Sequence, residues 1–181
     1  ECNEKLRNQR LSRGLLRPGC FRHAMVQNVA GGNTMILNRT ALDLARRASL
    51  EARRVVVHDW WLYQIITGAG GEVLFDDQPM LLYRQHGKNL IGANRGLRAK
   101  VKRVMVMTSG GLRRWNTVNI GALRASSHRL TEENCKILRE FSRERHAGPF
   151  RRLRMLRRTG VYRQGLAGTL SLYAAAILGQ L

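Results

Sequence analysis

The chain has 181 residues, enough for one domain with a sizeable core, and its 44% hydrophobic content excludes a chain that is disordered by composition. A net charge of +20, from 32 Lys plus Arg against 12 Asp plus Glu, indicates an anionic partner: nucleic acid, a phosphorylated substrate or an acidic membrane surface. The three cysteines lack the paired spacing of a zinc site and indicate free thiols in a reducing compartment.

The first part of the chain predicts a mixture of loop, strand and helix. Residues 1–23 are polar and basic and favour a loop or a short helix. Residues 25–30 form a short apolar run typical of a strand, and a glycine turn follows it. Residues 39–54 have the spacing of an amphipathic helix. Residues 55–57 are β-branched and favour an extended lead-in to the next element.

A second helix is predicted to start at His58 and Asp59, because Asp is a preferred N-cap residue. The glycine-rich residues 68–71 end this helix. Residues 72–75 and 80–83 then predict two short strands joined by a turn. The first half of the chain therefore predicts an α/β fold.

From residue 97 onward the pattern is helical. Helices are predicted over residues 97–107 and 112–126. A third helix starts at Thr131, with two acidic residues in its first turn, and ends at residues 146–149.

The C-terminal segment combines an Arg-rich helix over residues 150–163 with an uncharged, mostly apolar tail over residues 164–181. Glycine, glutamine and hydroxyl residues dilute the tail, which argues against a transmembrane span. Two interpretations stay open: a helix packed on its own domain, and an interfacial helix on anionic lipid.

Several residues between positions 31 and 89 could carry chemistry. Asp59 at a helix start can act as a general base, although a plain N-cap role explains it equally. His86 follows a predicted strand and could bind a metal or, with its cationic neighbours, a phosphate; the alternative is a solvated loop histidine. Of Trp60 and Trp61, one is expected in the core and the other as a wall on which a sugar stacks.

Three ordered motifs resemble the C-terminal half of family 2 glycosyltransferases, and most of all the bacterial enzymes that add rhamnose or related sugars to cell-surface polysaccharides. The motifs are residues 31–39, 58–63 and 81–93. The resemblance covers residues 24–93 well and the helical remainder loosely.

This resemblance implies a GT-A (Rossmann-like) fold, a nucleotide-diphosphate-sugar donor, a glycan acceptor that can be lipid-linked, and a divalent metal, Mg or Mn. It assigns Asp59 as the catalytic base of an inverting transfer and His86 as a metal ligand or diphosphate contact. The expected substrate-binding residues are Gly31, Gly32, Asn33, His58, Trp60, Trp61, Arg84, Gln85 and Asn89.

The chain departs from the family pattern because it contains no Asp-x-Asp metal motif, and only 23 residues precede Ala24. We therefore expect residues 1–93 to be the C-terminal part of a GT-A domain that lacks its nucleotide-binding half. Residues 94–181 would form a helical extension. This piece is expected to be inactive alone, and to lie in the cytoplasm or at the inner face of the cytoplasmic membrane.

A basic nucleic-acid-binding module is the alternative that the charge raises. The basic regions lack interleaved aromatic residues and match no nucleic-acid motif, so the glycosyltransferase interpretation is favoured.

Overall fold

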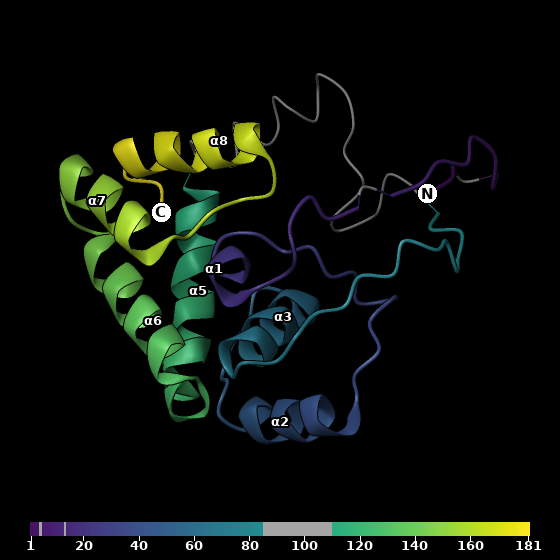
Figure 1. Ribbon diagram of the computed structural model, residues 1–181, viewed down its shortest axis with the longest axis horizontal. Coiled ribbons are helices and arrows are strands. Elements are labelled where there is room, and N and C mark those ends of the chain that lie inside the picture. The colour runs from purple at the N-terminus through teal and green to yellow at the C-terminus, as the bar shows by residue number, and fades with distance from the viewer. Residues whose placement is uncertain (4, 13, 85–109) are drawn as a thin grey trace.

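The computed structural model describes residues 1–3, 5–12, 14–84 and 110–181, and in these residues helices pack around a common core (Figure 1). The helix that the sequence predicts over residues 97–107 lies outside the described residues. In chain order the elements are α1 (Phe21–Ala24), α2 (Arg39–Ser49), α3 (His58–Gly68), α5 (Gly111–Ala125), the 3₁₀ turn η1 (Ser127–Arg129), α6 (Glu132–Glu144), α7 (Pro149–Thr159) and α8 (Leu166–Ile177).

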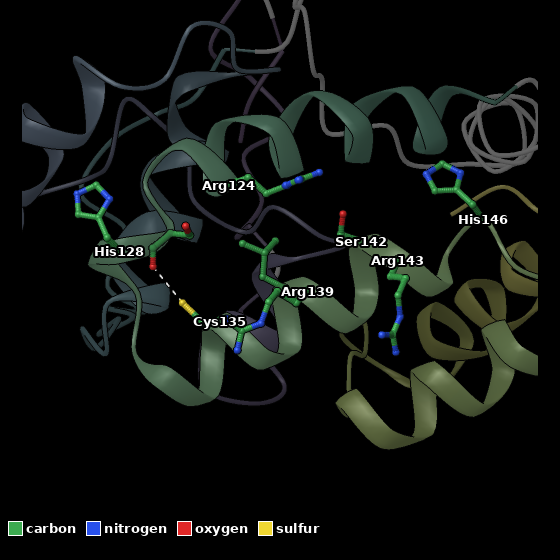
Figure 2. A pocket seen from close by; sticks show the side chains of 9 residues that line it. Arg124, His128, Cys135, Arg139, Ser142, Arg143 and His146 are labelled. Carbon is green, nitrogen blue, oxygen red and sulfur yellow. Dashed lines mark hydrogen bonds between the residues drawn. The ribbon is translucent and has the colours of Figure 1, made fainter.

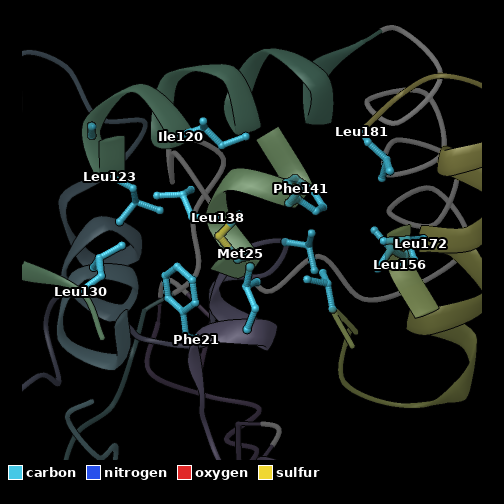
Figure 3. Packing of buried hydrophobic residues seen from close by; sticks show 14 of the residues in the cluster. Phe21, Met25, Ile120, Leu123, Leu130, Leu138, Phe141, Leu156, Leu172 and Leu181 are labelled. Atoms are coloured by element: carbon cyan, nitrogen blue, oxygen red, sulfur yellow. The ribbon is translucent and has the colours of Figure 1, made fainter. Parts of the chain in front are cut away.

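Helix α3 is the central element, because it contacts α1, α2 and α5. It is buried on nearly every side, so it lacks the polar face of an ordinary surface helix. Trp61 and Ile65 join the larger apolar cluster, and Trp60 and Tyr63 join a smaller one beside α1. Figure 3 shows members of the larger cluster, contributed by α1 and the C-terminal helices: Phe21, Met25, Ile120, Leu123, Leu138, Phe141, Leu156, Leu172 and Leu181.

Polar side chains hold both ends of α3. At its N-terminal end, Asn119 Oδ1 of α5 accepts a hydrogen bond from the backbone N–H of Val56 at 3.2 Å. At its C-terminal end, Asn134 Nδ2 of α6 donates to the carbonyls of Thr67 at 3.2 Å and Gly68 at 3.0 Å. Each of these carbonyls also accepts a backbone N–H, from Gly70 and from Thr131, so Asn134 adds a side-chain tie to a helix end that the backbone already satisfies.

Helix α1 is tied to α3 through side chains of α3. The carbonyl of Ala24, at the end of α1, accepts hydrogen bonds from Trp60 Nε1 at 2.7 Å and from Gln64 Nε2 at 3.0 Å. The Tyr63 hydroxyl lies 2.8 Å from His23 Nδ1 of α1. These bonds are buried, where a hydrogen bond has no competition from water.

The helix signals in the sequence are confirmed at several starts. Helix α2 begins at Arg39 as predicted, and Asn38 Oδ1 caps it by accepting from the N–H of Ala41 at 2.9 Å. It ends at Ser49, five residues before the predicted end. Helix α6 begins after Thr131, whose Oγ1 accepts from the N–H of Asn134 at 3.2 Å.

The predicted strands do not form within the described residues. Residues 25–30, 72–75 and 80–83 are turn or irregular, apart from isolated bridges that pair Gly19 with Val73 and Cys2 with Arg84. A strand needs a neighbour to satisfy its backbone groups, and here each segment meets at most one residue of a partner. The partial GT-A domain over residues 1–93 stays a prediction.

The uncharged tail forms α8, which packs on its own domain. Leu172, Ala175 and Ala176 are buried, and the Arg152 guanidinium of α7 donates to the carbonyls of Ala176 and Ile177 at the C-terminus of α8. The outer face of α8 remains exposed and apolar. Among the described residues, no helix has the length and apolar character that crossing a bilayer requires. Contact of this face with an anionic membrane stays a prediction.

Close packing at Gly68 provides a test of this arrangement. A Cβ added there would lie 2.6 Å from Leu130 Cδ2 and 3.1 Å from Phe21 Cε2. We expect Gly68→Ala to lower the free energy of unfolding by about 1–3 kcal/mol, the usual cost of overpacking.

Gly121→Ala on α5 is the matched control, because its Cβ would meet nothing within 4 Å. Its gain in helix propensity should raise stability by about 1 kcal/mol or less. Urea unfolding followed by circular dichroism measures both, and a Gly68→Ala variant as stable as wild type contradicts the packing described.

The buried His23 predicts a pH dependence of stability. Burial lowers the pKa of His23 to about 4, and within the described part of the chain its Nε2 has no hydrogen-bond partner. A histidine of the unfolded chain titrates near pH 6.5, so below that pH the unfolded state binds a proton at His23 more readily than the folded state does. The free energy of unfolding should therefore fall between about pH 6.5 and pH 4, by at most about 3 kcal/mol. Urea unfolding across this window should show a much shallower decline in His23→Gln, while His128→Gln, which changes an exposed histidine, should keep the wild-type decline. An unchanged decline in His23→Gln would exclude His23 as the cause.

Candidate functional site

Asp59 lies in the first turn of α3, and its carboxylate is held from two sides. Oδ1 accepts from Asn28 Nδ2 at 3.1 Å and from the N–H of Trp60 at 2.7 Å, and Oδ2 accepts from the N–H of Gly32 at 3.2 Å. Asp59 is not the N-cap that the sequence predicts, because Val57 occupies that position. The N-terminal turn of a helix still favours a carboxylate through its free N–H groups.

The glycine turn approaches the start of α3 closely. The carbonyl of Gly31 accepts from the N–H of Thr34 at 2.9 Å and from its hydroxyl at 3.0 Å, which closes the turn. A Cβ on Gly32 would lie 2.5 Å from His58 Nε2. Gly32 is exposed but lies against His58 and Asp59, and two of the three motifs that the sequence singles out meet at this point. Asn33 is exposed on the same turn.

Among the described residues, the hydrogen bonds leave Asp59 one acceptor position. Each carboxylate oxygen offers about two lone-pair sites. Oδ1 already accepts two hydrogen bonds, whereas Oδ2 accepts one, from Gly32. Asp59 is partly exposed, and among the described residues Gly32 alone donates to Oδ2. In chemical terms the site offers a fixed carboxylate that can take a proton from an alcohol.

The structure corrects the expectation of an aromatic wall at Trp60 or Trp61. Their exposures are 4% and 6%, because α3 is surrounded by other elements and leaves no free face for a sugar. The exposed tryptophan is Trp115 of α5, at 41%. Its ring centroid lies 6.2 Å from that of Trp60, with the rings at 89°. Sequence analysis missed Trp115 because nothing local to residues 112–126 shows that α5 packs beside α3.

The remaining predicted site residues are not assembled around Asp59 by any described contact. Arg84 is exposed, and its backbone forms the isolated bridge with Cys2. Gln85, His86 and Asn89 lie outside the described residues. The roles given to these four residues stay predictions.

The described part of the site does not fit a divalent metal. Within residues 1–3, 5–12, 14–84 and 110–181 no group of three His, Cys, Asp or Glu side chains could hold a metal ion. The hydrogen-bond donors around Asp59 occupy most of the acceptor positions of its carboxylate, and no second described carboxylate or imidazole completes a ligand set with it. The Mg or Mn site that the resemblance implies, with His86 as a ligand, stays a prediction, and no chemical step is derived through it.

Comparison with known proteins finds a partial similarity. A segment of 53 residues, which is 29% of the chain, is 40% identical in sequence to the dTDP-rhamnosyl transferase RfbG of Shigella flexneri. The matched segment spans 18% of that protein's length. No family model matches the chain, and no solved structure matches it. The similarity supports a glycosyltransferase-like relationship.

Proposed function

We propose that the chain supplies the acceptor side and the catalytic base of an inverting glycosyltransferase that uses a nucleotide-diphosphate sugar. The observation that carries this proposal is the Asp59 carboxylate, which Gly32 and Asn28 fix while the described residues leave one acceptor position free at Oδ2. The similarity to a dTDP-rhamnosyl transferase supports the same reaction class.

In the proposed reaction, Asp59 Oδ2 accepts the proton of an acceptor hydroxyl. The hydroxyl oxygen forms a bond to the anomeric carbon of the donor sugar. The bond from that carbon to the diphosphate breaks, and the nucleoside diphosphate leaves with the electron pair. A single displacement from the opposite face inverts the configuration. The hydrogen bonds from Asn28 and Gly32 keep the carboxylate in one orientation, which lowers the entropic cost of aligning it with the hydroxyl.

The proposed substrates are a rhamnose-type donor sugar and a cell-surface glycan acceptor. The name of the similar transferase supports the donor class. Trp115 supports a saccharide acceptor, because its exposed indole lies against Trp60, the residue that follows Asp59. An exposed aromatic ring presents a flat apolar face on which a sugar ring can stack.

Substitution of Asp59 tests the catalytic base. In the full open reading frame that encodes this chain, Asp59→Asn should lower kcat by about 10²–10⁴ and leave donor binding unchanged, because it removes the proton acceptor while keeping the side chain's size. Release of the nucleoside diphosphate measures turnover.

Asp43→Asn is the matched control, since Asp43 lies on α2 and pairs with Arg39 and Arg46. Its turnover should equal that of wild type. The 181-residue chain alone serves as the blank, because its sequence has no Asp-x-Asp motif to bind the donor through a metal. Near-normal turnover by Asp59→Asn would refute the assignment.

Substitution of Trp115 tests the acceptor site. Trp115→Ala should raise the KM for the glycan acceptor about fivefold or more and leave kcat and donor KM nearly unchanged, because the stacking energy of an aromatic face is about 1 kcal/mol or more. Trp115→Phe should retain most of the affinity. Phe150→Ala removes an exposed aromatic ring of α7 and should change neither constant. Initial rates at varied acceptor concentration separate these outcomes, and equal acceptor KM values for Trp115→Ala and wild type would exclude this role.

A further inference from the structure

A basic groove lies between α5 and α6, apart from the Asp59 site. Its volume is about 760 Å³, within the range of small-molecule sites. Most of its lining residues are arginine, histidine or serine, and no described lining residue is acidic or is Phe, Tyr or Trp. Figure 2 shows the polar side chains along the two helices, with His128 and His146 at opposite ends: Arg124, His128, Arg139, Ser142, Arg143 and His146.

The α6 side of the groove is one continuous helix face that runs on past the helix end. Arg139, Ser142, Arg143 and His146 are spaced three and four residues apart, which places them on one side. Arg139 and Arg143 stand one turn apart, and like charges at this spacing destabilise an isolated helix. Arg124 of α5 adds a further positive charge. An anion bound here would relieve this repulsion.

The nearest carboxylates neutralise the groove only in part: Glu51 Oε1 lies 3.4 Å from His128 Nε2, and Glu144 pairs with Arg143. Glu51, beside His128, is already bound by Arg129 and by the Ser126 hydroxyl, and these hydrogen bonds lower its pKa to about 2. Glu144 binds Arg151 as well as Arg143. Within the part of the chain that the structure describes, Arg124 and Arg139 form no ion pair with a carboxylate.

A buried arginine makes the His146 end of the groove more positive. Arg145 is 3% exposed and forms no ion pair within the described residues. Its guanidinium donates to Thr117 Oγ1, to the carbonyl of Arg113 and to His146 Nε2. Because His146 Nε2 accepts this bond, the neutral ring carries its hydrogen at Nδ1, where it is a donor. A buried charge without a counter-ion is costly, so a nearby anion stabilises this end.

We propose that the α5–α6 groove binds the diphosphate group of a small or lipid-borne ligand along Arg124, Arg139, Ser142 and His146. Arginine guanidinium groups suit phosphate oxygens because they donate several hydrogen bonds in a fixed plane. Single-stranded nucleic acid fits less well, since it is held by stacking on aromatic side chains and none lines the described groove. The proposal does not depend on the transfer reaction at Asp59.

Isothermal titration of the 181-residue chain with inorganic diphosphate tests the site. The double variant Arg124→Gln/Arg139→Gln should bind about tenfold more weakly, because it removes two charged donors. Arg114→Gln/Arg154→Gln removes the same charge from exposed positions outside the groove and should weaken binding less than about twofold. Circular dichroism checks that both variants are folded.

Two results would overturn the proposal. One is equal weakening by the two double variants, which would show that diphosphate responds to net charge alone. The other is no binding by wild type at millimolar diphosphate.

Vesicles distinguish the two sources of the diphosphate. Phosphatidylcholine vesicles are compared with and without diacylglycerol pyrophosphate in a sedimentation assay. Binding that requires the pyrophosphate lipid, and that the groove substitutions remove, supports a lipid-borne ligand. Binding of soluble diphosphate without vesicle binding supports a soluble ligand. The groove is contradicted as the site if the double variant Arg124→Gln/Arg139→Gln still binds the vesicles and also binds soluble diphosphate as tightly as wild type.

Discussion

The hydrogen bonds that Asn119 accepts and Asn134 donates at the two ends of α3 are the constraint on which the rest of the structure depends. Apolar packing alone would not fix the rotation of a helix that is buried on nearly every side, because many rotations bury similar area. Hydrogen bonds are directional, so the bonds at Val56 and Gly68 select one position. That position sets the carboxylate of Asp59 beside the glycine turn.

Helix α5 connects the two candidate sites. Its N-terminal half presents Trp115 to Trp60, next to Asp59, and its C-terminal half presents Arg124 to the basic groove. The same helix buries the amide of Asn116, whose two polar atoms have no hydrogen-bond partner among the described residues. Burying an unsatisfied amide lowers the free energy of unfolding by about 1–3 kcal/mol. The packing contacts of α5 with its neighbours must therefore outweigh this loss.

Local signals in the sequence predicted the features that local chemistry decides. The start of α6 after Thr131 and the start of α2 at Arg39 were predictable, because a helix start depends on residues within one turn. Thr131 and Asn38 cap these two helices. The family resemblance assigned Gly32 and Asp59 to one site, and the hydrogen bond between them is a detail that the sequence did not predict. The cap of α3 was predicted at His58 and Asp59 and is Val57, a residue with no capping side chain.

Features that depend on distant partners were not predictable. The apolar runs at residues 72–75 and 80–83 have strand-like composition, but a strand forms only where another chain segment satisfies its backbone groups. The burial of Trp61 and the exposure of Trp115 depend on which helices surround them, and the basic groove depends on the packing of α5 against α6. Charge and periodicity specify none of these contacts.

The perpendicular contact between Trp60 and Trp115 also gives the molecule an optical signature. Two indole rings held 6.2 Å apart at a fixed angle couple their electronic transitions, and the near-ultraviolet circular dichroism then carries a signal from the pair. Such signals vanish when side chains lose their fixed packing, even where helices persist. Since one ring belongs to α3 and the other to α5, this signal reports the docking of these two helices separately from the helical content of the chain.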